Sequence, residues 1–145
     1  KFNNFLKKKY YEPDIQIQFS PYLSKIASSS IDISDGLAQD LQHLCTNSGC
    51  GAIVDLNSLP LSSICKTLIK QKKIQLKNIF SNGDDYQILF TANKKKRNLI
   101  KKISMYTATK ISKVGIVKSA SNSETISIIN GKFKLPQKLG YIHNF

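Results

Sequence analysis

The chain has few acidic residues and almost no arginine. It carries 9 Asp and Glu against 22 Lys and Arg, and its formal net charge is +13. Such a balance invites binding to nucleic acid, because cations neutralise phosphates. Arg97 is the sole arginine, however, and base and phosphate recognition favours the bidentate guanidinium. Since the lysines are also spread along the chain, we expect no nucleic-acid partner. A basic nucleic-acid-binding module stays open as an alternative.

Cysteine, histidine and long apolar runs are scarce as well. The three cysteines form no CxxC pair and the chain has only two histidines, so a disulfide framework and a zinc site are both disfavoured. No apolar run is long enough for a membrane span, and the first residues lack the apolar core of a signal peptide. We therefore expect a soluble, cytoplasmic protein with reduced thiols and no membrane partner.

The length and composition are those of one folded domain. The chain has 145 residues, of which 41% are hydrophobic, enough for a real core. Because it does not begin with Met, we expect a fragment of a longer protein. Residues 1–19 are predicted to be a basic lead-in, extended around Pro13, that links a missing N-terminal domain to a C-terminal α+β domain over residues 20–145.

Hydrophobic periodicity predicts strands and helices that alternate early, followed by strands. The expected helices span residues 20–27, 35–48, a stretch capped by Ser62 or Ser63, and a basic stretch that follows Asn93. The expected strands span residues 29–33, 52–56, 86–92, 110–117 and 124–129. Asn130 and Gly131 then form a hairpin signal. This order predicts an α+β fold with a mixed β-sheet packed with helices.

Three of the nine acids lie in the segment "SIDISDGLAQDL". Ser34 and Asp35 stand where a helix should begin, and both are preferred N-caps, which is the simpler explanation for them. Capping does not explain Asp32, which ends the incoming strand. Hard oxygen ligands at that point suit Mg²⁺, and a helix N-terminus suits phosphate. We interpret Asp40, one turn further along, as a solvated helix position.

Asp84 and Asp85 form the second acidic site, in "SNGDDYQILF". An exposed turn explains this composition, but adjacent acids before a buried strand also suggest screening by a cation. The two clusters hold five of the nine acids, which favours cation binding. The Walker loop, GxGxxG and HExxH are all absent. His43 and His143 have no partner at catalytic spacing, so we single out no catalytic residue.

Taken together, "IDISDGL", "NGDDYQILFTA" and "LGYIHNF" resemble the C-terminal half of the thiamine-monophosphate kinase family, over nearly the whole chain. The family belongs to the aminoimidazole ribonucleotide synthetase superfamily, whose members join an N-terminal domain with further metal-binding aspartates to a C-terminal α+β domain. The resemblance implies ATP-dependent phosphorylation of thiamine phosphate to thiamine diphosphate, with several Mg²⁺ ions, in a homodimer. The alternative within the superfamily is a purine-precursor synthetase, whose glycine-rich stretch is missing among these seven scattered glycines.

The resemblance also implies roles for individual residues. It makes Asp32 and Asp35 Mg²⁺ ligands and Ser34 an ATP contact, and it places Asp84 and Tyr141 against the substrate.

The sequence departs from the family in two places. The family usually has Gly-Gly-Glu-Asp-Tyr where this chain has Asn-Gly-Asp-Asp-Tyr over residues 82–86, so the carboxylate of Asp84 is retracted by one methylene. In the tail, His143 and Phe145 match the family less closely than Tyr141 does.

Overall fold

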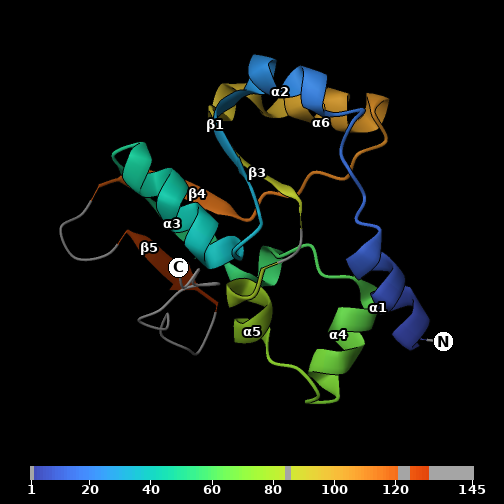
Figure 1. Ribbon diagram of the computed structural model, residues 1–145. Helices are drawn as coiled ribbons and strands as arrows, with labels where there is room; N and C mark the ends of the chain where they lie inside the picture. The colour runs from blue at the N-terminus through green and yellow to red at the C-terminus, as the bar shows by residue number, and fades with distance from the viewer. Residues whose placement is uncertain (1, 84–85, 121–124, 131–145) are drawn as a thin grey trace, which may run out of the picture.

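The computed structural model describes residues 2–83, 86–120 and 125–130 (Figure 1). Its α-helices are α1 (Phe2–Tyr11), α2 (Ser20–Ile26), α3 (Leu37–Asn47), α4 (Ser63–Lys70), α5 (Leu76–Ser81) and α6 (Arg97–Tyr106). Its strands are β1 (Ala27–Asp32), β2 (Cys50–Asp55), β3 (Ile88–Ala92), β4 (Gly115–Ser119) and β5 (Ile126–Ile129). Short 3₁₀ turns at Leu56–Ser58 and Lys94–Lys96 follow β2 and precede α6. Within the described ranges, no helix is both long and apolar enough to cross a membrane.

The strands form two small sheets. β1 and β3 pair antiparallel, with Asp32 opposite Ile88 at one end of the ladder. In the other sheet, β2 is the central strand, antiparallel to β4 and parallel to β5. The predicted α+β fold with a mixed sheet is confirmed, and the mixed sheet is the three-stranded one. The β1–β3 pair forms a separate ladder.

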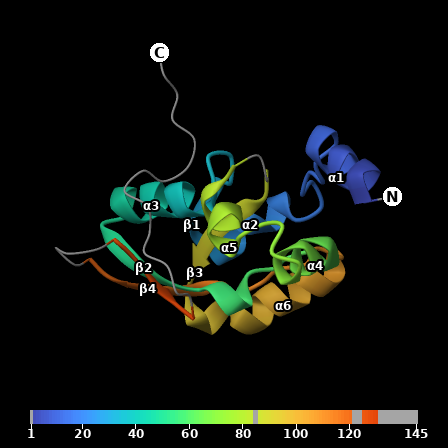
Figure 2. The same cartoon turned by 90° about the horizontal axis from the view of Figure 1, so that it is seen from below.

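The main core lies between α3 and the three-stranded sheet (Figure 2). Apolar residues recur at helical spacing along α3, so one face of the helix is buried. That face presents Leu37, Leu41 and Leu44, which pack in one cluster with Val54 of β2 and Ile126 of β5. Burying one such side chain stabilises the fold by about 1.5–3 kcal/mol. This packing fixes where α3 begins relative to the end of β1.

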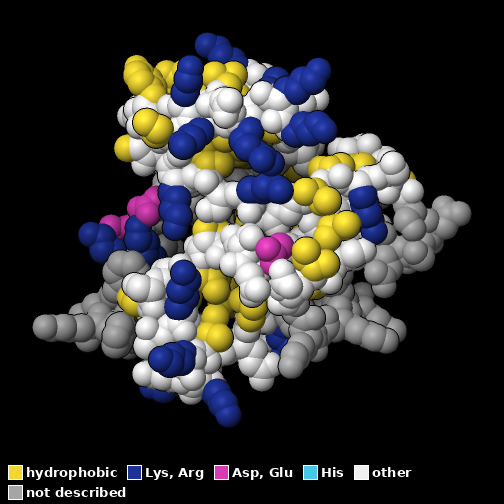
Figure 3. Space-filling view, turned by 180° about the vertical axis from the view of Figure 1, so that it is seen from behind, with side chains coloured by type: hydrophobic (Ala, Val, Ile, Leu, Met, Phe, Trp, Pro, Cys, Tyr) yellow, Lys and Arg dark blue, Asp and Glu magenta, His cyan; other side chains and the backbone are white. Residues whose placement is uncertain are grey.

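A second, smaller core joins α2 and α6 to the β1–β3 ladder. Phe19, Ile26 and Ile103 are its buried members, and the ring of Phe19 lies 5.7 Å from the ring of Phe90 on β3. The lysines around α6 point outward, as expected for the wet face of an amphipathic helix, and Figure 3 shows them gathered on this layer. From the helical spacing of its apolar residues, Leu99, Ile100 and Ile103 are expected on the inner face of α6; for Leu99 this is wrong, because the residue is 44% exposed.

The structure differs from the predicted elements mainly in its helices and in where they begin. α1 and α5 were not predicted, since neither carries a recognisable cap or a long apolar stripe. Of residues 10–19, predicted to be extended around Pro13, Tyr10 and Tyr11 are helical instead, because α1 runs to Tyr11. Ser62 caps α4 by accepting a hydrogen bond from the Cys65 amide at 3.1 Å, and Asn93 accepts one from Lys95. The sequence favours Ser20 as the N-cap of α2, ahead of Pro21, but Ser20 is the first residue of the helix and Phe19 is its N-cap.

The three cysteines are free thiols that differ in burial. Cys45 is fully buried, and Cys50 and Cys65 are partly exposed. Burial raises the pKa of the Cys45 thiol to about 11, and the neighbouring Cys50 adds to the shift. Because the thiolate is the reactive form, Cys45 is a packing residue rather than a nucleophile.

Candidate functional site

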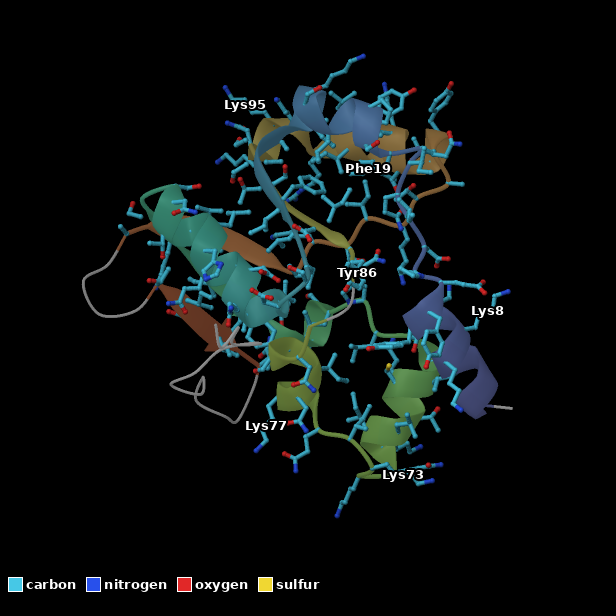
Figure 4. The ribbon with its side chains drawn as sticks, viewed as in Figure 1. Lys8, Phe19, Lys73, Lys77, Tyr86 and Lys95 are labelled. Carbon is cyan, nitrogen blue, oxygen red and sulfur yellow. The ribbon has the colours of Figure 1, made fainter. Side chains whose placement is uncertain are left out.

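The two acidic segments of the sequence meet at one end of the β1–β3 ladder. The amide of Ile33 donates to the carbonyl of Gln87 at 2.8 Å, and the amide of Tyr86 donates back to the carbonyl of Ile33 at 2.9 Å. These bonds extend the ladder past Asp32, so the loop of residues 33–36 lies beside residues 81–83 and 86–87. Figure 4 labels Tyr86 at this point. We call this meeting of residues 33–36 with residues 81–83 and 86–87 the acidic junction.

Two glycines allow the backbones to touch at the acidic junction. A Cβ on Gly36 would lie 2.6 Å from the carbonyl oxygen of Ser81, and a Cβ on Gly83 would lie 1.9 Å from that of Ser34. Real side chains never approach backbone that closely. Gly36 also has a φ of 120°, a backbone conformation that residues other than glycine rarely adopt. Each loop therefore needs its glycine for the other loop to reach it.

Asp40 holds the loop of residues 33–36 through hydrogen bonds to its backbone. Its Oδ2 accepts hydrogen bonds from the amides of Ser34, Asp35 and Gly36, each at 3.1 Å, and its residue is only 2% exposed. Burial raises the pKa of this carboxyl group, and the three amide donors oppose that shift. The prediction of a solvated Asp40 is wrong, because the loop folds back over the first turn of α3 and covers the side chain.

The same geometry corrects the predicted helix cap. α3 begins at Leu37 with Gly36 as N-cap and no side-chain cap bond. Neither Ser34 nor Asp35 is the N-cap, because both residues precede Gly36, which has that position. Helix capping, the simpler explanation for Ser34 and Asp35, is therefore wrong.

The predicted site residues that the structure describes lie on or next to this loop. Asp32 is exposed at the end of β1, and Ser34 and Asp35 are half-buried. Gln39 donates from Nε2 to Oδ2 of Asp35 at 3.0 Å, which holds that carboxylate beside α3. Asp84, Asp85 and Tyr141 lie outside the described residues. His43 is exposed on α3, and His143 also lies outside them.

The donors at the acidic junction suit a hard cation but do not complete its shell. Carboxylate and hydroxyl oxygens are the ligands that Mg²⁺ prefers, and it takes six of them. In the part of the chain that the structure describes, no group of three or more His, Cys, Asp or Glu could hold a metal. Asp32 and Asp35 could supply only part of the ligand set of a Mg²⁺ ion.

One buried hydroxyl at the acidic junction has no hydrogen-bond partner among the described residues. It is Oγ of Ser81, next to the point where Gly36 approaches α5. Buried polar atoms nearly always have a partner, which makes this hydroxyl an exception among the described residues. Sequence reasoning did not single out Ser81, and it placed Asp40 in solvent, because the folding of the loops that bury these residues leaves no local pattern.

An open hollow of about 390 Å³ lies elsewhere, between α2 and β1. Its lining is mostly serine, and it includes Ser24, Ser28 and Ser30. None of the predicted site residues lines it. The candidate site is therefore the acidic junction, where the groups that can bind a cation lie, and not this hollow.

Known proteins resemble this chain over nearly all of its length, although no family model matches it. It is 37% identical over 146 residues to the thiamine-monophosphate kinase of Buchnera aphidicola subsp. Schizaphis graminum, an alignment that covers 99% of this chain and 44% of the relative. It is 36% identical over 88 residues to that of Escherichia coli K12, covering 61% of this chain and 27% of the relative. The chain thus spans less than half the length of these curated relatives.

Solved structures share the fold. A structure described as AaThiL complexed with AMPPCP and TMP has a TM-score of 0.76 at 28% identity, covering 97% of this chain and 42% of that one. Thiamine monophosphate kinase from Aquifex aeolicus has a TM-score of 0.69 at 26% identity, covering 93% of this chain and 42% of that one. The likeness in sequence and the likeness in fold therefore point to the same group of proteins.

Proposed function

This chain belongs to the thiamine-monophosphate kinase family, and we propose that the complete protein containing it phosphorylates thiamine phosphate to thiamine diphosphate with ATP. The observation that carries the proposal is the alignment of 99% of the chain with such a kinase at 37% identity. The acidic junction supports it, because it gathers hard oxygen donors in an otherwise basic chain. The related structure with AMPPCP, a non-hydrolysable ATP analogue, and TMP adds the two ligand classes.

In this proposal the loop of residues 33–36 binds the nucleotide end of the site. Asp32 and Asp35 would hold Mg²⁺, which when bound supplies charge neutralisation for the transferring phosphates. Ser34, which lies between them in the sequence, would donate a hydrogen bond from its hydroxyl to ATP. Phosphoryl transfer requires mainly positioning and charge stabilisation. This is consistent with a site in which no side chain of this chain is assigned as catalytic.

Asp84 and Tyr141 would receive the organic part of thiamine phosphate. Asp84 follows Gly83 directly in the sequence. Thiamine phosphate carries a positively charged thiazolium ring, which favours a nearby carboxylate and the face of an aromatic ring, the latter worth roughly 0.5–2 kcal/mol. These two assignments rest on the family resemblance.

The remaining parts of the proposal concern partners. Since the chain spans 44% of its Buchnera relative, we propose that an N-terminal domain of the same protein supplies further carboxylates for Mg²⁺. We further propose a homodimer that acts in the cytoplasm, without nucleic acid or membrane as partner.

The experiment that tests the function compares the complete protein with the 145-residue chain. With ATP, Mg²⁺ and thiamine phosphate, the complete protein is expected to form thiamine diphosphate, measured by chromatography. The isolated chain is expected to form none, because its described residues include no group of three or more carboxylates that could hold the metal, and Mg²⁺ needs six ligands. Absence of product from the complete protein would contradict the function, and turnover by the isolated chain would contradict the need for a second domain.

Tyr141→Ala in the complete protein is expected to raise KM for thiamine phosphate by about 2- to 30-fold, the equivalent of losing one cation–π contact. KM for ATP and the melting temperature should stay nearly unchanged. Asp84→Glu, which restores the usual side chain of the family, serves as the partner variant and should preserve or lower that KM. A large drop in melting temperature with KM unaltered would instead make Tyr141 an anchor for the tail.

A further inference from the structure

The amides of Ser34, Asp35 and Gly36 form an anion-binding concavity at the start of α3. Successive backbone N–H groups that converge on one point bind anions, and the N-terminus of a helix adds a partial positive charge. Such a place commonly receives a phosphate in nucleotide-binding proteins. Here it is already filled, because all three amides donate to the same carboxylate oxygen of Asp40.

The Asp40 carboxylate has little else to compensate its charge. The residue is only 2% exposed, and neither ion pair found among the described residues involves it. A buried charge of this kind is costly unless it is fully hydrogen-bonded. The loop and the carboxylate therefore stabilise each other, because the loop satisfies the charge and the charge fixes the loop.

We propose that Asp40 is a positioning residue, which holds the loop of residues 33–36 in place and closes the N-terminus of α3 to phosphate. The Mg²⁺ nucleotide then meets side chains of the loop, Ser34 and Asp35, rather than its backbone amides. Asp40 does not touch the ligand. This inference rests on the proposed function to the extent that the ligand is a Mg²⁺ nucleotide.

The position of Asp35 shows how the effect is transmitted. Its amide is held by Asp40 at 3.1 Å, and its side chain is held by Gln39 at 3.0 Å. Both holding residues lie on the first turns of α3, whose inner face is anchored in the main core. The carboxylate of Asp35 is thus fixed from two sides. Loss of one support should let it move relative to the segment of residues 81–83.

The test measures binding of Mg²⁺–AMPPCP to the complete protein by calorimetry, with the melting temperature recorded for each variant. Asp40→Ala is expected to weaken binding by about 10- to 100-fold, as is usual when a residue that orients metal ligands is lost. Asp40→Asn, which keeps an acceptor oxygen for the amides, is expected to recover part of that loss.

Asp55→Ala is the matched control. Asp55 also accepts a backbone hydrogen bond, from Asn57 at 3.0 Å, and it also binds the hydroxyl of Ser58 at 2.8 Å. It caps the 3₁₀ turn after β2 and takes no part in the acidic junction. Its loss is expected to lower the melting temperature and to leave the affinity for Mg²⁺–AMPPCP within about twofold, the scatter of a few tenths of a kcal/mol that a distant site shows.

Three results would overturn the proposal. The first is an affinity of Asp40→Ala within about threefold of the wild type, which is less than half of one tenfold step. The second is an Asp40→Asn variant that binds no better than Asp40→Ala. The third is an equal loss of affinity in Asp55→Ala. If Asp40→Ala does not fold, Asp40→Asn takes its place, with an expected loss of about 10-fold. If neither folds, the carboxylate is a requirement of the whole fold and the proposal is wrong.

Binding and turnover separate this proposal from the proposed function. A wild-type protein that binds Mg²⁺–AMPPCP but does not phosphorylate thiamine phosphate would contradict the function and leave the test of Asp40 intact. A wild-type protein that turns over thiamine phosphate, with Asp40→Ala binding normally, would contradict only the role of Asp40. A wild-type protein that does not bind Mg²⁺–AMPPCP would overturn both.

Discussion

Asp35→Asn in the complete protein is expected to lower the rate of thiamine phosphate phosphorylation by on the order of 100-fold or more, a loss of roughly 2.7 kcal/mol of transition-state stabilisation. Asparagine keeps the shape of the side chain and an oxygen for Gln39, which donates to Asp35 at 3.0 Å. It removes the charge that would hold Mg²⁺. The melting temperature should therefore change little. Asp32→Asn is expected to lower the rate in the same way, and it should also leave the melting temperature nearly unchanged, because Asp32 is exposed.

The observed start of α3 makes this prediction sharper. If Asp35 were the N-cap, asparagine would replace it almost silently, since Asn and Asp cap about equally well. The N-cap is Gly36 instead, so a structural role of that kind cannot account for a large effect. Steady-state kinetics with Asp55→Asn as control would measure the difference. A rate for Asp35→Asn within about twofold of the wild type, a few tenths of a kcal/mol, would remove Asp35 from the metal site.

Gly83→Ala is expected to have the second large effect, because it forces the two acidic loops apart. A Cβ at this position would lie 1.9 Å from the carbonyl oxygen of Ser34, so one of the two backbones has to move. Overpacking of this kind typically destabilises a protein by about 1–3 kcal/mol. A displacement of about 1 Å at a catalytic site can reduce the rate on the order of 100-fold. We therefore expect a loss of activity well beyond the loss of stability.

Gly49→Ala provides the control for Gly83→Ala. Gly49 has a φ of 60° and nothing within 4 Å of its added Cβ. Alanine there brings backbone strain of about 1–2 kcal/mol without any clash. It lies at the far end of α3 from the acidic junction. Thermal unfolding and kinetics of both variants, measured side by side, should show similar losses of stability and a loss of rate only in Gly83→Ala. Equal activity in the two variants would contradict the role of the junction.

Local features of the sequence predicted much of the fold. The hydrophobic stripe of α3, the cap at Ser62 and the stop at Gly49 depend on residues within a few positions of one another. Such contacts form within one helix or turn, so the sequence pattern alone indicates them. The same holds for Asp32 at the end of β1. The sequence did not predict α1 and α5, because their local patterns are weak.

The candidate site shows the limit of local reasoning. The sequence by itself determined that acids gather in two segments and that these segments match one kinase family. Only the tertiary structure decided that the two segments meet, through the pairing of Ile33 with Tyr86 and Gln87. It also decided that Asp40 is buried and that Ser34 and Asp35 are not caps. The physical reason is that the strand pairing joins residues about 50 positions apart, which no pattern within a single segment encodes. The burial of Asp40 depends on how the loop before α3 folds back over the helix, which the periodicity of the helix does not encode.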